Sequence, residues 1–138
     1  MAQTIAELMA RDPVTCPPDA PIRSAAQQMR DRDAGDVVVT EGDDVRGIVT
    51  DRDVVVRAVA DGRGPDTPLS EVLSGEVVTV APGDRVERAA ELMREHAVRR
   101  LPVVDAGRLV GVVSLGDLAI ERDADSALAD ISAARENG

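Results

Sequence analysis

The heptapeptide GIVTDRD occupies residues 47–53, and GVVSLGD repeats its pattern at residues 111–117. Each copy runs from a glycine through two aliphatic residues to a hydroxyl residue, and an aspartate follows three positions later. The aliphatic pair is typical of a buried strand, and the hydroxyl residue is typical of a helix N-cap. Each copy therefore predicts a strand that turns directly into a helix.

The separation of 64 residues between the two motifs holds along most of the chain. Shifted by that amount, Val14-Thr15 matches Val78-Thr79, Met29-Arg30 matches Met93-Arg94, and no gap is needed across residues 14–60. Chance similarity would not keep one register through helices, strands and turns together. We conclude that the chain contains an internal duplication.

Each copy is predicted to fold as strand, helix, strand, strand, helix. Apolar residues at helical spacing mark the first helix, which Pro21 begins in the first copy as a first-turn proline. One copy alone would leave a face of its sheet exposed to water, whereas two copies can cover each other. The predicted fold class is therefore α/β, with tandem β-α-β-β-α repeats packed with pseudo-twofold symmetry. The predicted strands are 14–15, 36–40 and 45–50, then 77–80, 100–104 and 109–114, and the predicted closing helices are 51–61 and 115–122.

The predicted domains are residues 1–64, the first repeat with a leading helix, residues 65–124, the second repeat, and residues 125–138, a helical tail. The Gly- and Pro-rich stretch from Gly62 to Pro68 is the joint between the repeats. Thr4 and Glu7 have the spacing of a capping box, with Ile5, Leu8 and Met9 inward. The tail carries Leu128 and Ile131 as apolar anchors and is interpreted either as a frayed terminus or as a dimer or partner contact.

Composition excludes several classes of function. The chain of 138 residues has a formal net charge of −10, which opposes binding to nucleic-acid phosphates or to an anionic membrane. It has no aromatic residue on which a base could stack and one cysteine, which excludes an internal disulfide. No apolar run approaches ~18 residues and no secretory leader is recognisable, so we predict a cytoplasmic protein.

The hydroxyl and the aspartate of each motif have two interpretations. A helix N-terminus suits an anion, an aspartate can accept both hydroxyls of a ribose, and the glycine would let the backbone approach a ligand closely. The structural alternative is a capping box, which only satisfies the amides of the helix. Taken alone, one motif favours capping. Two copies in one register, each with Asp where a capping box prefers Glu or Gln, favour a binding site.

The second repeat resembles the CBS domain family. The segments 101–105 (LPVVD) and 111–118 (GVVSLGDL) carry the resemblance, which covers both repeats from Ile5 to Asp123. Residues 50–55, with Val14, Thr15 and Cys16, further resemble small two-repeat proteins of actinobacteria. The resemblance implies a homodimeric module that binds AMP, ADP, ATP or S-adenosylmethionine in two clefts between the repeats, although some members bind nothing detectable.

Carried onto this chain, the family pattern implies two unequal clefts. The first would use Ser114, Asp117, Arg99, Arg100 and Leu101, with Thr15 and Ala20 from the other repeat, and the second would use Thr50, Asp53, Gly35, Asp36 and Val37, with Thr79. The first repeat departs from the pattern at Gly35-Asp36, where the second has Arg99-Arg100. It also has Val37-Val38-Val39 in place of Leu101-Pro102-Val103.

The remaining chemically notable residues favour structural roles. His96 stands alone and is interpreted as a helix-end residue or, less favourably, a phosphate contact. Cys16 is interpreted as a small buried hydrophobe rather than a nucleophile. The acidic runs 31–33 and 41–44 are interpreted as solvated surface rather than an oxygen-only metal site. Because no triad, phosphate loop or acid pair can be assembled, an enzyme is not predicted.

Two functions remain after this comparison. The favoured one is a regulatory sensor module that binds an adenine nucleotide or S-adenosylmethionine without a metal and acts on an unknown effector protein. The alternative is a ligand-free scaffold or protein-interaction module. No nucleic acid or membrane partner is expected in either case.

Overall fold

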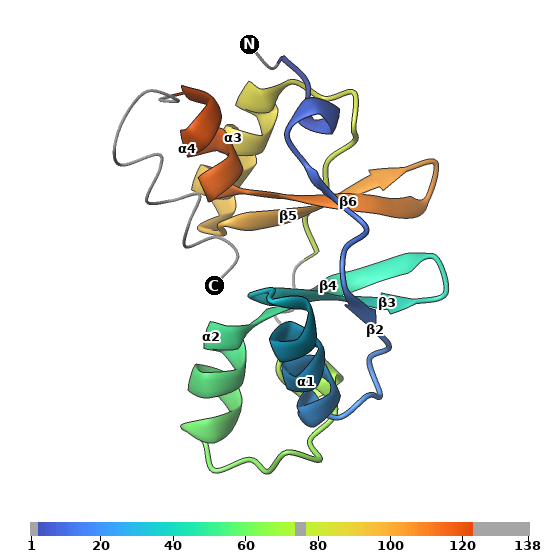
Figure 1. Cartoon of the computed structure of the whole chain (residues 1–138), viewed down its shortest axis with the longest axis vertical. Coiled ribbons are helices and arrows are strands. Elements are labelled where there is room, and N and C mark those ends of the chain that lie inside the picture. Colours follow the sequence, from blue (N-terminus) through green and yellow to red (C-terminus); the bar gives the residue numbers. More distant parts are fainter. Residues whose placement is uncertain (1–2, 74–76, 123–138) are drawn as a thin grey trace. The chain divides into compact units, whose positions relative to one another are not determined.

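The structure, a computed structural model, describes residues 3–73 and 77–122, with side chains described to residue 119. The chain forms two compact units. One contains the described residues between 14 and 77, and the other joins residues 3–13 to residues 78–122. The unit of residues 14–77 has the predicted order of strand, helix, strand, strand, helix, and in each unit the helices lie on one side of a three-stranded sheet (Figure 1).

The unit of residues 14–77 contains the sheet order β2-β3-β4. Strand β2 runs parallel to β3, and β3 and β4 form an antiparallel hairpin with an irregularity at Val39/Thr40. The hairpin turn contains Gly42, which has a positive φ of 63°. The elements are β2 (Thr15–Cys16), α1 (Ile22–Arg32), β3 (Asp36–Glu41), β4 (Asp44–Thr50), α2 (Asp51–Asp53), η2 (Val54–Val59) and η3 (Leu69–Glu71).

The other unit contains the sheet order β1-β6-β5, with both pairs antiparallel. The predicted strand 77–80 is reduced to an isolated parallel bridge between Val80 and Val103. The third strand of this sheet is instead the leading strand β1, which pairs with β6 at the edge opposite to β5. The elements are η1 (Ile5–Glu7), β1 (Ala10–Arg11), α3 (Val86–His96), β5 (Arg100–Asp105), β6 (Arg108–Ser114) and α4 (Leu115–Arg122).

The leading segment of each repeat packs in the unit formed by the rest of the other repeat. Ile5 is fully buried in the cluster of residues 78–118, and its amide donates to the Asp84 carbonyl at 2.9 Å. Leu69 is equally buried in the other cluster, and its amide donates to the Ala20 carbonyl at 2.9 Å. The compact units therefore have other bounds than the predicted repeats 1–64 and 65–124, because each leading segment buries its apolar side chains against the sheet and helix of the other repeat.

These leading segments also explain the two motif glycines. A β-carbon on Gly111 would lie 2.7 Å from the Ala10 carbonyl oxygen and 2.8 Å from the Met9 sulfur. A β-carbon on Gly47 would lie 3.1 Å from a methyl group of Leu73. Both glycines thus leave room for the chain's own leading segments.

The cores consist of aliphatic side chains, as the composition requires. On α1 the buried residues are Ile22, Ala25 and Met29, which confirms the predicted helical spacing. On α3 they are Val86, Ala89, Leu92 and Met93. Each helix packs on its own sheet, so the duplication yields two separate clusters of similar composition.

Neither α1 nor α3 starts with a side-chain cap; backbone carbonyls from the leading segment of the other repeat replace it. The Ile22 amide donates to the Thr67 carbonyl at 2.8 Å, and the Val86 amide donates to the Gln3 carbonyl at 3.1 Å. Pro21 is the N-cap residue of α1, whereas the sequence predicted it in the first turn of that helix. These bonds satisfy amides that would otherwise have no partner.

Three local predictions are wrong or lie outside the described residues. The Thr4 hydroxyl donates to the Glu7 carboxylate at 3.1 Å instead of accepting from a backbone amide, so no capping box forms there. The predicted helix 51–61 is α-helical only at Asp51–Asp53 and continues as the π-helix Val54–Val59, whose register is marked by the bond from the Ala60 amide to the Val55 carbonyl. The predicted tail 125–138 lies outside the described residues.

Candidate binding site at the two strand–helix junctions

The repeated hydroxyl–aspartate pair forms a complete capping box in each unit. The Asp53 amide donates to the Thr50 hydroxyl at 3.1 Å, and the Thr50 amide donates to Asp53 Oδ2 at 2.9 Å. The same two bonds join Ser114 and Asp117 at 3.1 Å and 2.8 Å. The capping interpretation is therefore correct for both copies. Each half-buried carboxylate still has lone pairs available, because one amide uses only part of its acceptor capacity.

The start of the preceding strand lies beside each capping box. In the second repeat Arg100 is the register partner of Ser114, and the Leu115 amide donates to the Arg99 carbonyl at 2.8 Å. In the first repeat Asp36 is the register partner of Thr50, and the Asp51 amide donates to the Gly35 carbonyl at 3.1 Å. The structure thus brings together the predicted residues of each junction within a single unit.

The two junctions differ in charge. Arg99 is exposed and Arg100 is half-buried, and both cations lie at the strand start beside Ser114. The half-buried Asp36 occupies the corresponding place next to Thr50, and Asp51 adds a second carboxylate whose Oδ1 accepts from the Arg52 amide at 2.8 Å. The contrast that the sequence predicted between the repeats is present at the level of strand register.

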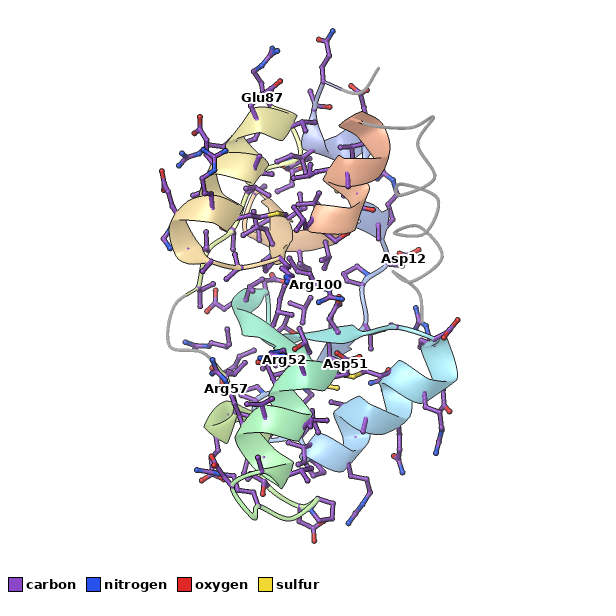
Figure 2. The ribbon with its side chains drawn as sticks, turned by 90° about the vertical axis from the view of Figure 1, so that its left-hand side faces the viewer. Asp12, Asp51, Arg52, Arg57, Glu87 and Arg100 are labelled. Carbon is purple, nitrogen blue, oxygen red and sulfur yellow. The ribbon has the colours of Figure 1, made fainter. Side chains whose placement is uncertain are left out.

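Arg57 is the functional candidate that sequence reasoning missed. Its Nε lies 3.6 Å from Asp53 Oδ1, the oxygen that the Thr50 amide does not use. Arg57 lies on the same helical segment as Asp51 and Arg52 (Figure 2). The i,i+4 spacing of an acid and a base after the motif is a signal that could have identified the pair.

Val37 and Leu101 contribute to the cores and not to an open surface. They are 0% and 1% exposed, respectively, in the clusters of their units. Their side chains pack against other aliphatic residues of their own units. Their strands position the neighbouring Asp36 and Arg100.

The residues assigned to each site from the other repeat lie in the opposite unit. Thr15, exposed on β2, and Ala20, half-buried, belong to the unit of Thr50. The exposed Thr79 belongs to the unit of Ser114. The unit with the Thr50–Asp53 capping box therefore also contains Thr15 and Ala20, which were predicted for the Ser114 site. The unit with the Ser114–Asp117 capping box also contains Thr79, which was predicted for the Thr50 site.

Cys16 and His96 have the structural positions predicted for them. Cys16 is buried in the aliphatic cluster, and burial raises the pKa of its thiol, although the bond from Gln28 Nε2 to Sγ at 3.4 Å acts in the opposite direction. His96 is the last residue of α3. Among the described residues, no group of three or more His, Cys, Asp or Glu side chains could hold a metal ion. No helix within the described ranges is long and apolar enough to span a membrane.

Comparison with known proteins identifies the family. A profile for the CBS domain matches residues 5–59 and again residues 69–122. The CBS domain-containing protein YhcV of Bacillus subtilis is 41% identical over 133 residues, which cover 94% of this chain and 95% of that protein. Hypoxic response protein 1 of Mycobacterium tuberculosis is 36% identical over 100 residues, covering 71% of this chain and 70% of that protein. The predicted resemblance to two-repeat actinobacterial proteins is thereby confirmed.

Two solved structures are similar to this chain and contain bound groups. A CBS domain protein from Pyrobaculum aerophilum complexed with AMP has a TM-score of 0.76 and 32% identity, covering 95% of this chain and 98% of that one. A crystal structure of Hypoxic Response Protein I with two coordinated zinc ions has a TM-score of 0.75 and 31% identity, covering 84% and 96%.

Proposed function

Because this chain belongs to the CBS domain family, with two repeats in one chain, we propose that it is a regulatory module that binds an adenine nucleotide at its two strand–helix junctions. The observation that carries the proposal is the reciprocally bonded pair of hydroxyl and aspartate at both junctions. The AMP bound by the Pyrobaculum aerophilum relative supports the choice of ligand class.

Each junction offers two kinds of polar contact to such a ligand. The hydroxyl and the amides at the helix start suit a phosphate, and the remaining lone pairs of Asp53 or Asp117 suit the hydroxyls of a ribose. Arg99 and Arg100 favour an anionic ligand in the second repeat. The ligand is AMP, ADP, ATP or S-adenosylmethionine in this proposal, with no metal and no catalytic step.

The proposed module acts in the cytoplasm as a homodimer and reports ligand binding to an effector protein. Support for self-association comes from the exposed valines of the π-helix, Val55, Val56 and Val59. The alternative function is a ligand-free scaffold that keeps the fold and uses the same apolar surface to bind a protein.

Calorimetric titration of the folded protein with AMP, ADP, ATP and S-adenosylmethionine tests the proposal. We expect saturable binding of at least one of the four. Because the chain has no aromatic residue, a nucleotide that co-purifies with it would dominate the absorbance near 260 nm. Absence of binding to all four ligands by folded protein free of bound nucleotide would favour the scaffold.

A further inference from the structure

The Asp53 carboxylate is shared between two donors. Its Oδ2 accepts from the Thr50 amide at 2.9 Å, while its Oδ1 lies 3.6 Å from the Nε of Arg57. The Asp53 side chain is 25% exposed and that of Arg57 is 47% exposed. A guanidinium therefore stands at the carboxylate oxygen that would otherwise be available to a ligand.

The sequence of the second repeat has no arginine at the position that corresponds to Arg57. The position that corresponds to Arg57 in the second repeat holds Glu121, four residues after Asp117. The cations of the second repeat, Arg99 and Arg100, lie instead at the strand start beside Ser114. The first repeat thus has its cation next to the carboxylate, and the second has its cations next to the hydroxyl.

We propose that Arg57 competes with ligand hydroxyls for the carboxylate of Asp53 and thereby lowers the ligand affinity of the first-repeat site. This inference rests on the proposed function. A ribose diol that donates to Asp53 Oδ1 must displace the guanidinium or share the oxygen with it. The module would then fill its second-repeat site first and its first-repeat site only at higher ligand concentration, which extends its response range.

The size of the effect follows from the exposure of the pair. Partly exposed ion pairs at i,i+4 spacing are weak and are screened by salt. Their removal corresponds to about a two- to fivefold change in an affinity that competes with them. Adenosine is the suitable probe, because it carries the ribose but no phosphate, so the loss of a positive charge near a phosphate cannot obscure the result.

The experiment uses the full chain with Asp117→Asn. This substitution removes the negative charge at residue 117 and keeps a side-chain oxygen that can accept a hydrogen bond from the Ser114 amide. Adenosine and AMP are titrated into this variant by calorimetry, alone and combined with Arg57→Gln, Arg57→Lys or Arg52→Gln. Arg52→Gln is the matched control, because it removes the same charge from the same helix without touching the Asp53 pair. Circular dichroism verifies folding.

We expect Arg57→Gln to raise adenosine affinity about two- to fivefold at low salt, and we expect this gain to disappear at high salt as the pair is screened. Arg57→Lys, which keeps the charge, should stay near the starting affinity, and so should Arg52→Gln. Restoration of binding by Arg57→Gln in an otherwise silent Asp117→Asn chain would also support the proposal.

An unchanged or lower adenosine affinity in folded Arg57→Gln would overturn it, as would an equal gain from Arg52→Gln. So would an Asp117→Asn chain that binds nothing and is not rescued. The proposed function fails separately: in that case the unmodified protein binds none of AMP, ADP, ATP and S-adenosylmethionine.

Discussion

At the scale of single residues, Gly111 lies where the leading strand β1 meets its sheet. It is the register partner of Arg11, and the Ala10 carbonyl oxygen lies 2.7 Å from the place that a β-carbon would occupy. The contact is with backbone, which cannot rotate away as a flexible side chain could. The leading segment must therefore move if residue 111 gains a methyl group.

Gly111→Ala is expected to lower the free energy of unfolding by about 1–3 kcal/mol, the usual cost of overpacking a tight site. Urea unfolding followed by circular dichroism measures the change. Gly83→Ala is the matched control, because nothing lies within 4 Å of the β-carbon it would add. Equal stability of the two variants would show that the leading segment does not pack closely against Gly111.

Cys16 gives the fold a pH dependence in the alkaline range. Burial disfavours the thiolate, so the pKa of Cys16 is raised in the folded protein relative to the unfolded chain. The unfolded chain then loses its thiol proton first, beginning near the ordinary thiol pKa of about 8.5. The resulting contribution to stability is complete below that pH and is lost as the pH rises through the folded-state value.

Cys16→Ala should therefore flatten the dependence of the unfolding free energy on pH above about 8.5, although the variant is less stable at neutral pH because a buried side chain is truncated. Urea unfolding at a series of pH values from neutral to alkaline provides the measurement. A pH dependence unchanged by the substitution would mean that Cys16 ionises equally easily in both states.

At the scale of elements, the last helix of each repeat combines structure with the proposed function. The capping box holds the start of α2 and of α4, and the same aspartate is the proposed ribose contact. Removal of an N-terminal cap costs about 1 kcal/mol of stability. Any substitution there must therefore be judged by folding and by binding together.

Asp117→Ala is expected to remove most nucleotide binding, whereas Asp53→Ala should leave a strong site. The reason is that Arg100 partners Ser114 in register, while Asp36 takes the equivalent place beside Thr50. Exchanging attraction for repulsion of a phosphate at about 4 Å is worth about 1 to 4 kcal/mol, roughly tenfold or more in affinity. Calorimetry with the best nucleotide, on variants whose folding is verified, compares the two.

Equal losses in the two variants, or the reverse order, would contradict this asymmetry. They would also remove the support for Arg99 and Arg100 as phosphate contacts. The capping cost is expected to be similar in the two variants, because each aspartate has the same two hydrogen bonds to its hydroxyl residue.

Local patterns in the sequence were sufficient to predict the hairpins and the amphipathic helices, and they offered capping as one of two interpretations of the hydroxyl–aspartate pairs, because each feature depends on residues a few positions apart. The packing of Ile5 and Leu69 could not be predicted in this way. Their placement depends on partners that are distant in the sequence, such as Asp84 for Ile5 and Ala20 for Leu69. The π-helix of Val54–Val59 is also a matter of backbone register, which side-chain periodicity does not specify.

At the scale of the whole molecule, the distribution of apolar surface favours self-association. Val55, Val56 and Val59 are 59%, 47% and 63% exposed on the π-helix Val54–Val59. Val55, Val56 and Val59 lie on one helical segment, so together they form an exposed apolar patch, and such a patch is typical of an interaction surface. Because stable dimers bury about 2,000 Å² or more, these valines would form the centre of a larger interface.

We expect a homodimer through this helix, and the combined change Val55→Glu and Val59→Glu should yield a folded monomer in light scattering at micromolar concentration. The carboxylates would be buried and mutually repulsive across the interface. Val77→Glu is the control, since Val77 is 44% exposed outside the helix. Each subunit carries a formal charge of −10, so screening by salt should strengthen the dimer. A wild-type protein that stays monomeric with every adenine nucleotide would mean that no such interface exists. A dimer that persists with both glutamates would mean that the interface lies elsewhere.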